Sequence, residues 1–357
     1  MLRYKILGHS GLRVSELCLG AMTFGEDFGW GASLDECRAM LDQFADLGGN
    51  FIDTANGYTG GTSERFVGQL VKGQRERFVI ATKFNNSTAR AGVTFDRHPN
   101  ASGNHRKSMT EALNASLTRL GTDYIDLYWV HAWDSITPVD ETLRALDDAV
   151  RAGKILYIGM SNAPAWWIAR ANTMAELRGW SRFAAMQIEY SLAQRTPERE
   201  LIPMSRAMDL SVCAWSPLAA GVLTGKYGND APADGTRRMD VNNRPLSKQR
   251  VALAAGLAVI AKDLGCSPAQ LALAWLMRGP GAIPIVGART QAQLRDNLGA
   301  ATLQLDATVM QRLDEISKPS LGYPHEILDS NGQRLLTHTA AMDRIDVHRD
   351  EGGVMRP

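Results

Sequence analysis

Short apolar segments alternate with amphipathic segments along most of the chain, and this alternation limits the fold more than any other feature. Strands that alternate with helices form a parallel sheet. Eight such units in one chain favour a closed (β/α)8 TIM barrel over an open sheet. The eight expected strands cover residues 17–21, 51–55, 78–82, 125–130, 155–160, 184–188, 210–215 and 282–286.

The segments between these strands carry helix signals at their ends. Ser33 has a side chain suited to an N-cap, and Pro138 suits the first turn of a helix. Gly121 and Gly153 directly follow helical segments, where glycine readily adopts a left-handed conformation. Residues 4–17 predict a β-hairpin ahead of the first barrel strand.

We expect the barrel to occupy residues 1–328 and residues 329–357 to form a C-terminal tail, either folded over a pocket or flexible. Two polar segments, residues 85–107 and 225–245, leave from the carboxyl ends of strands. Each is interpreted either as a cover for a pocket or as a surface loop. An open dinucleotide-binding sheet would carry a glycine fingerprint after its first strand, and residues 20–25 (GAMTFG) do not match one.

Charge and cysteine usage exclude several classes of protein. The chain has 39 Lys and Arg against 38 Asp and Glu, so it has no excess charge for a nucleic-acid or anionic-membrane partner. It has no apolar run of the ~20 residues that a membrane helix needs, and no secretory signal is expected. The four cysteines are far apart and indicate reduced core residues in a cytoplasmic protein.

Polar side chains stand at the carboxyl ends of three expected strands. Asp53 lies in the strand of residues 51–55, Lys83 follows residues 78–82, and His131 follows residues 125–130. Tyr58 lies five positions beyond Asp53. If these strands are parallel neighbours, the four side chains converge on one face of the barrel, where barrel enzymes carry their reactive groups.

These four groups form a set that can protonate a carbonyl oxygen. A phenol has a pKa near ~10, and a nearby ammonium favours its ionised form and lowers that pKa. Lys83 could supply the ammonium to Tyr58, with Asp53 as the carboxylate that keeps a buried lysine charged. His131 can donate a hydrogen bond to the carbonyl oxygen. Since no residue supplies a nucleophile or a metal site, the attacking group must come from a cofactor, and hydride is the natural choice.

Each of these residues, taken singly, has an ordinary structural explanation. Asp53 and Lys83 could form a stabilising ion pair, Tyr58 could be a packed aromatic, and His131 could be a core histidine. Their conjunction at successive strand ends favours a catalytic role. A metal-dependent barrel hydrolase is the third class considered, but His98 and His105 lie in a polar segment without a clear third ligand.

The motifs in this order resemble those of the aldo-keto reductase superfamily. The segments that carry the resemblance are FIDTANGY with GTSE after residue 50, ATK at 81–83, IGMSN at 158–162, QIEY at 187–190, WSPLAAGVLTGKY at 215–227 and IPIVGAR at 283–289. The resemblance covers residues 3 to 325. It implies NADPH-dependent carbonyl reduction with Tyr58 as the general acid, tuned by Lys83 and Asp53, and His131 as the residue that orients the carbonyl.

The same resemblance implies a set of positions that bind NADP(H). Ser161, Asn162 and Gln187 would hold the nicotinamide carboxamide, and Trp215 would stack on the nicotinamide ring. Arg289 suits a 2′-phosphate, because a guanidinium fork matches phosphate geometry. The expected cofactor positions are Gly20, Met22, Asp53, Ser161, Asn162, Gln187, Trp215, Ser216, Pro217, Leu218, Gly221, Leu223, Lys226, Gly287, Arg289, Gln293, Asp296 and Asn297.

An apolar substrate wall is expected beside the nicotinamide, which would favour aromatic or otherwise hydrophobic aldehydes and ketones. The residues expected in or near it are Met22, Phe24, Tyr58, Phe84, Trp129, His131 and Trp133. The chain departs from many relatives after Asn162, where APAWW follows. A nicotinamide-binding regulatory subunit with weak or no turnover is the alternative function. The physiological substrate and the oligomeric state are left open.

Overall fold

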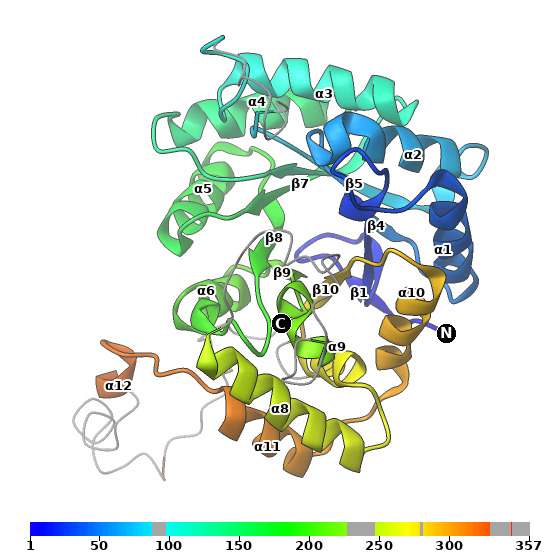
Figure 1. Cartoon of the computed structure of the whole chain (residues 1–357). Coiled ribbons are helices and arrows are strands. Elements are labelled where there is room, and N and C mark those ends of the chain that lie inside the picture. Colours follow the sequence, from blue (N-terminus) through cyan, green and yellow to red (C-terminus); the bar gives the residue numbers. More distant parts are fainter. Residues whose placement is uncertain (88–97, 227–246, 279–280, 329–343, 345–357) are drawn as a thin grey trace.

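Eight parallel strands close into a barrel in the order β10-β3-β4-β5-β6-β7-β8-β9. The computed structural model describes residues 1–87, 98–226, 247–278, 281–328 and 344. The prediction of a (β/α)8 TIM barrel is confirmed (Figure 1). The barrel strands are β3 Cys18–Gly20, β4 Phe51–Asp53, β5 Val79–Phe84, β6 Ile125–Val130, β7 Ile155–Ser161, β8 Phe183–Glu189, β9 Ser211–Trp215 and β10 Ile283–Val286.

Neighbours in the sequence are neighbours in the barrel, and β10 closes it by pairing with β3. All these pairs are parallel, so the carboxyl ends of the strands share one face, which we call the catalytic face. In the β5–β6 pair, Lys83 stands opposite Trp129. The strand β5 runs two residues beyond the predicted segment, so Lys83 lies within it.

Helices cover the outside of the barrel, and their ends largely follow the predicted signals (Figure 1). Ser33 accepts a hydrogen bond from Glu36 N as the N-cap of α1, and Pro138 is the N-cap of α4. The α-helices are α1 Leu34–Asp46, α2 Thr62–Leu70, α3 Arg106–Leu120, α4 Val139–Arg151, α5 Ala165–Arg178, α6 Leu201–Ala207, α8 Lys248–Asp263, α9 Pro268–Arg278, α10 Gln291–Leu298, α11 Ala307–Ser317 and α12 His325–Leu328.

The core has two parts, as a barrel with an outer ring of helices requires. Phe51, Leu127 and Trp129 fill the barrel interior, while Tyr128 and Val130, on the alternate positions of β6, pack against the helices. Among the described residues, no single helix has the length and apolar composition of a membrane span. The pair α8 and α9 meets that criterion only together and is bent by 91° between them.

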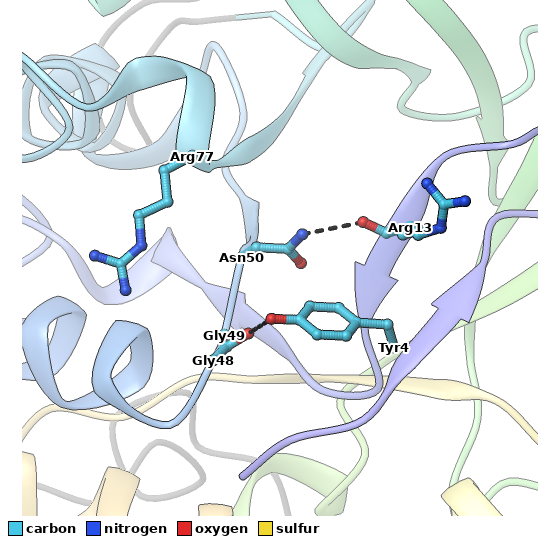
Figure 2. Close-up of a pocket in the computed structure, with 6 residues that line it drawn as sticks. All are labelled: Tyr4, Arg13, Gly48, Gly49, Asn50 and Arg77. Atoms are coloured by element: carbon cyan, nitrogen blue, oxygen red, sulfur yellow. Dashed lines mark hydrogen bonds between the residues drawn. The ribbon is translucent and has the colours of Figure 1, made fainter.

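The predicted hairpin of β1 Tyr4–Ile6 and β2 Arg13–Ser15 covers the end of the barrel opposite the catalytic face. Lys5 Nζ donates to the carbonyl oxygens of Gly281 and Ala282, at 2.7 and 3.1 Å, and so fastens the hairpin to the entry of β10. A small surface pocket lies beside the hairpin, where the Tyr4 hydroxyl donates to the Gly48 carbonyl oxygen (Figure 2).

Three predictions fall wholly or partly outside the described residues. These are the tail at 329–357, most of the segment 225–245, and residues 88–97 of the segment 85–107. Residues 98–105 of that last segment are described and lie against the loop after β6, since Asn104 N donates to Asp134 Oδ2 at 2.6 Å.

Candidate active site

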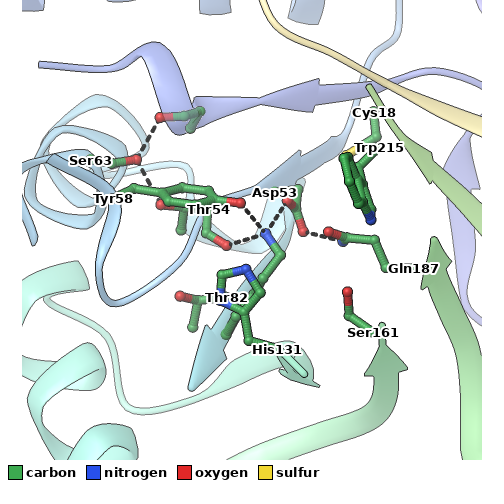
Figure 3. A network of polar contacts seen from close by, with 12 residues as sticks. Cys18, Asp53, Thr54, Tyr58, Ser63, Thr82, His131, Ser161, Gln187 and Trp215 are labelled. Atoms are coloured by element: carbon green, nitrogen blue, oxygen red, sulfur yellow. Dashed lines mark hydrogen bonds and ion pairs between the residues drawn. The ribbon is translucent and has the colours of Figure 1, made fainter. Parts of the chain in front are cut away.

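A cavity of about 620 Å³ opens on the catalytic face of the barrel. Asp53 is the last residue of β4, Lys83 lies near the end of β5, and His131 directly follows β6. Tyr58 begins a short 3-10 helix, η2 Tyr58–Gly61, just beyond β4. Asp53, Tyr58 and His131, which lie close together in Figure 3, line the cavity, and Lys83 is buried in contact with Asp53 and Tyr58.

Lys83 has three hydrogen-bond acceptors within the barrel. Its Nζ donates to Asp53 Oδ2 in an ion pair, to the Thr54 carbonyl oxygen at 2.8 Å and to the Tyr58 hydroxyl at 3.1 Å (Figure 3). The lysine side chain has no exposed surface. The structure therefore brings together the three residues that the sequence analysis combined into a proton-donating set.

The ammonium of Lys83 is stabilised in its charged form. Burial alone would lower the pKa of Lys83, but the charge of Asp53, the Tyr58 hydroxyl and the hydrogen bonds to both raise it above its usual value. A permanent positive charge thus stands 3.1 Å from the phenol oxygen. Such a charge stabilises the phenolate that remains once the proton has left.

His131 is held in its neutral form. Burial and the nearby charge of Lys83 lower the pKa of His131 to about 3. Its ring lies edge-on to Tyr58 with 6.0 Å between the centroids. Within the described part of the chain, its buried Nδ1 has no hydrogen-bond partner. A neutral imidazole can donate one hydrogen bond to an oxygen that approaches Tyr58.

Amide groups crowd the floor of the cavity next to Asp53. Gln187 Nε2 donates to Asp53 Oδ1 at 2.9 Å. The side-chain oxygen Oε1 of Gln187 remains as an acceptor. Asn162 Nδ2 donates to Ser161 Oγ and to the His131 carbonyl oxygen, both at 2.9 Å. Trp215 Nε1 donates to Asn162 Oδ1 at 3.0 Å, so one asparagine connects the Trp215 ring to the His131 backbone.

The rest of the cavity extends around β9 and β10 and carries cationic side chains. Lys226 and Arg289 line it there. Asp296 also lines it, but its two oxygens accept hydrogen bonds from Ser267 and Gln270. The expected cofactor positions that line the cavity are Gly20, Met22, Asp53, Asn162, Gln187, Trp215, Ser216, Pro217, Leu218, Gly221, Lys226, Gly287, Arg289, Gln293, Asp296 and Asn297.

Two expected cofactor positions and several expected substrate positions lie away from the cavity surface. Ser161 and Leu223 are buried. Phe84 follows Lys83 in β5 and points outward, where it stacks on Tyr128 between barrel and helices. Phe24 belongs to that outer layer too, and Trp129 fills the barrel interior. Trp133 packs edge-to-face on Trp166 beyond His131 and does not line the cavity.

Trp30 lines the cavity from the loop between β3 and α1 and was not predicted from the sequence. An aromatic between Gly29 and Gly31, in the long loop that follows the first barrel strand, was the available signal. Other lining residues that were not predicted are Thr23, Ala220, Thr224, Ala269, Ile285, Val286 and Ala288. His98 and His105 have local roles, since His98 Nδ1 accepts from Asn100 N and His105 Nδ1 accepts from Ser108 N at the start of α3.

The chemistry of the lining residues fits a dinucleotide that carries an extra phosphate. Gln187 and Asn162 line the cavity with side-chain amides, the groups that pair with a carboxamide, and the buried Ser161 hydroxyl accepts a hydrogen bond from Asn162. Lys226 and Arg289 place positive charge in the far part of the cavity, where phosphates would lie. The turn that precedes Lys226 is tight, because Ala219, Ala220 and Gly221 have φ of 49°, 57° and 91°.

Comparisons with known proteins agree with this geometry. A model of the "Aldo/keto reductase family" matches residues 16–318. The chain is 35% identical over 333 residues to a norsolorinic acid reductase of Emericella nidulans, covering 91% of this chain and 84% of that protein. It is 34% identical over 352 residues to an aryl-alcohol dehydrogenase [NADP(+)] of Phanerodontia chrysosporium, covering 93% and 90%. It is 37% identical over 331 residues to the oxidoreductase YrpG of Bacillus subtilis, covering 88% and 96%.

Proposed function

The chain belongs to the aldo/keto reductase family, and we propose that it is an NADP(H)-dependent oxidoreductase that reduces aldehydes or ketones to alcohols. The reverse reaction oxidises the alcohol when substrate ratios favour it. The observation that carries this proposal is the 3.1 Å contact between Lys83 Nζ and the Tyr58 hydroxyl, with Asp53 paired to the same ammonium.

Tyr58 is the proposed proton donor to the carbonyl oxygen. The phenol is a weak acid, so it needs a group that stabilises the phenolate left behind. Lys83 supplies that stabilisation through its hydrogen bond to the Tyr58 oxygen, and Asp53 keeps Lys83 charged. His131, neutral above its pKa of about 3, donates a hydrogen bond that orients the carbonyl oxygen toward Tyr58.

NADP(H) is the proposed cofactor, and when bound NADPH supplies hydride to the carbonyl carbon. Gln187, Asn162 and Ser161 would hold its carboxamide, and the Trp215 ring would cover one face of the nicotinamide. Lys226 would meet the pyrophosphate, and Arg289 would meet the 2′-phosphate. The relative from Phanerodontia chrysosporium, whose printed name contains NADP(+), supports this choice.

The proposed substrates are neutral carbonyl compounds with an apolar or aromatic body. Met22 and Trp30 line the cavity together with Tyr58 and His131. The charged lining residues are Asp53, Lys226, Arg289 and Asp296, and Asp53 is already paired with Lys83. Among the residues that the structure describes, a carboxylate or phosphate on the substrate would therefore find no cation near Tyr58 other than Lys83. The name of the relative from Phanerodontia chrysosporium, an aryl-alcohol dehydrogenase, supports an aromatic substrate.

The site of action is proposed to be the cytoplasm. All four cysteines are unpaired, and three of them are buried. Thiols stay reduced in that compartment.

Replacement of Tyr58 by phenylalanine tests the proposal. NADPH oxidation is followed by absorbance with a panel of aromatic and aliphatic aldehydes and ketones. For Tyr58→Phe we expect kcat to fall by at least about 100-fold, because general acid catalysis contributes that much. NADP+ affinity, measured by quenching of tryptophan fluorescence, should be unchanged. If the wild-type protein oxidises NADPH with none of the carbonyl compounds in the panel, the proposed function is wrong and a binding role would be favoured. Full turnover in Tyr58→Phe would also show that the proposed function is wrong.

A further inference from the structure

Asn85 occupies a strained position directly after β5. It follows Phe84 and lies two residues beyond Lys83. Its φ is 93°, a left-handed value that residues other than glycine rarely adopt. Asn85 is only 7% exposed, so the conformation is enforced by the surrounding structure. Backbone strain of this kind persists only where local contacts over-determine it, and it clusters at functional sites.

The Asn85 side chain is hydrogen-bonded to the loop that carries His131. Its Nδ2 donates to the Ala132 carbonyl oxygen and to Asn104 Oδ1, each at 2.6 Å. The same strand end makes a second bond to this loop, because His131 N donates to the Phe84 carbonyl oxygen at 3.1 Å. The peptide group that precedes His131 and the peptide group that follows Ala132 are therefore fixed to residues 84 and 85.

A partly buried polar network around Asn104 supports the hydrogen bonds of Asn85. Asn104 N donates to Asp134 Oδ2 at 2.6 Å, and the Asn104 carbonyl oxygen accepts from Thr142 Oγ1 at 3.3 Å. Asp134 also accepts from Thr137 N at 2.6 Å, which closes the turn after His131. Three chain segments on the catalytic face thus meet at the amide group of Asn85.

The His131 ring itself has little else to hold it. Its Nδ1 has no partner within the described residues, and no side chain there orients the ring by a hydrogen bond. Tyr58 contacts it only by its edge, and Lys83 faces it with a positive charge. The ring must then take its position from its own backbone.

We propose that Asn85 is a positioning residue, which holds His131 at the place where it meets a carbonyl oxygen next to Tyr58. This inference rests on the proposed function for the role of His131, but the position of the ring can be measured without turnover. A displacement of about 1 Å in a catalytic group lowers the rate on the order of 100-fold.

The main variant is Asn85→Gly, which removes the side-chain hydrogen bonds. Glycine adopts a φ of 93° without strain. Asn85→Ser is the second variant, because its side chain ends one atom short of the amide nitrogen. The matched control is Asn172→Ala. The Asn172 side chain, like that of Asn85, makes two hydrogen bonds, here both to the backbone of Phe183, but it lies on α5 at the entry of β8.

Two measurements decide the proposal. We expect kcat to fall by about 10- to 100-fold in both Asn85 variants, while NADP+ affinity is retained. The ring signal of His131, assigned with His131→Gln, is then followed by NMR. In wild type it should not titrate above about pH 5, since its pKa is about 3; in the Asn85 variants it should titrate nearer 6.5 as water reaches the ring.

Unchanged turnover and an unchanged His131 signal in a folded Asn85 variant would overturn the proposal. So would an equal effect of Asn172→Ala on either measurement. If Asn85→Gly fails to fold, Asn85→Ser supplies both readings. If wild type reduces no carbonyl compound, the proposed function fails, yet the NMR titration still decides whether Asn85 positions the ring.

Discussion

Gln187 donates its amide hydrogen to Asp53 Oδ1 at 2.9 Å and so joins two residues that lie 134 positions apart in the chain. Asp53 uses its other oxygen for the ion pair with Lys83. The Asp53 carboxylate therefore connects Gln187, which is expected to bind the nicotinamide carboxamide, with the Lys83 ammonium that contacts Tyr58. The proposed cofactor contact of Gln187 and the proposed proton donor Tyr58 thus depend on the same carboxylate.

Gln187→Glu should make cofactor binding depend on pH. The introduced carboxyl would face Asp53, and two adjacent carboxylates do not both ionise readily. At low pH the introduced group keeps its proton and still donates to Asp53. At high pH it repels Asp53, so we expect NADP+ affinity to fall by about 10-fold between pH 6 and pH 8, the equivalent of roughly 1.4 kcal/mol.

Fluorescence titration of NADP+ measures this effect, with wild type as the reference. Adenosine 2′,5′-bisphosphate is the matched ligand, because it lacks the nicotinamide and should bind equally well at both pH values. A pH-independent loss, or an equal loss for both ligands, would contradict the shared role of Asp53.

Lys83→Met should destabilise the fold as well as abolish turnover. Removal of one partner of a buried ion pair leaves the other charge uncompensated, which costs about 3–5 kcal/mol. Asp53→Asn in the same chain removes that charge and keeps an acceptor for Gln187, so the double variant should regain at least about half of the lost stability. Guanidinium unfolding measures the free energies, and neither variant should regain activity. A double variant no more stable than Lys83→Met would show that the pair does not act through charge.

The positions of Asp53, Lys83 and His131 could be predicted because parallel strands bring their carboxyl ends to one face. Asp53 ends β4, Lys83 stands one residue before the end of β5 and His131 directly follows β6, so the place of each followed from strand topology. Tyr58 was harder, since it lies on a 3-10 turn, yet its distance from Asp53 in the sequence is short. The contact between Gln187 and Asp53 could not be predicted, because it depends on the depth of side chains within a closed barrel.

The substrate wall was predicted less well, for a definite physical reason. Side chains of a strand alternate between its faces, so Phe84 must point outward if Lys83 points inward. Trp129 does point inward, but it packs against Gly159, where an added Cβ would lie 2.3 Å from the ring, and fills the barrel below the cavity. The inward or outward direction could be derived from the strand period; the depth could not.

Acid should destabilise the protein partly through His131. Its pKa in the folded chain is about 3, below the value of about 6.5 in an unfolded chain. The neutral form is therefore favoured by folding. The contribution of neutral His131 to the free energy of unfolding is fully present above about pH 6.5. It is lost as the pH falls toward 3, at up to roughly 1.4 kcal/mol per pH unit.

His131→Gln should remove this contribution, because glutamine does not titrate. Unfolding free energies of both proteins, measured from pH 7 to pH 4, should converge or cross as the pH falls. A constant difference between them would contradict a depressed His131 pKa. Since the ring stays neutral above pH 5, the turnover of wild type should show no step near pH 6.5 that His131→Gln removes.

Trp30 should determine how well aromatic substrates are used. Its loop is fixed, because Gly25 N donates to the Ala32 carbonyl oxygen at 3.0 Å and Ala32 N donates to the Thr23 carbonyl oxygen at 2.8 Å. Gly31 cannot be replaced there, since an added Cβ would lie 1.9 Å from the Gly25 carbonyl oxygen. The Trp30 ring, with Phe28 at a centroid distance of 5.8 Å, is thus held at the cavity wall.

Trp30→Ala should lower kcat/KM for benzaldehyde or naphthaldehyde by about 10-fold, because stacking of aromatic rings contributes roughly 0.5–1.5 kcal/mol. For a small aliphatic aldehyde, which cannot stack, kcat/KM should stay within the error of the measurement. Trp180→Ala is the matched control, since that ring packs beneath Arg144 and Arg178 away from the cavity. Equal losses for aromatic and aliphatic aldehydes would mean that Trp30 supports the loop and does not contact the substrate.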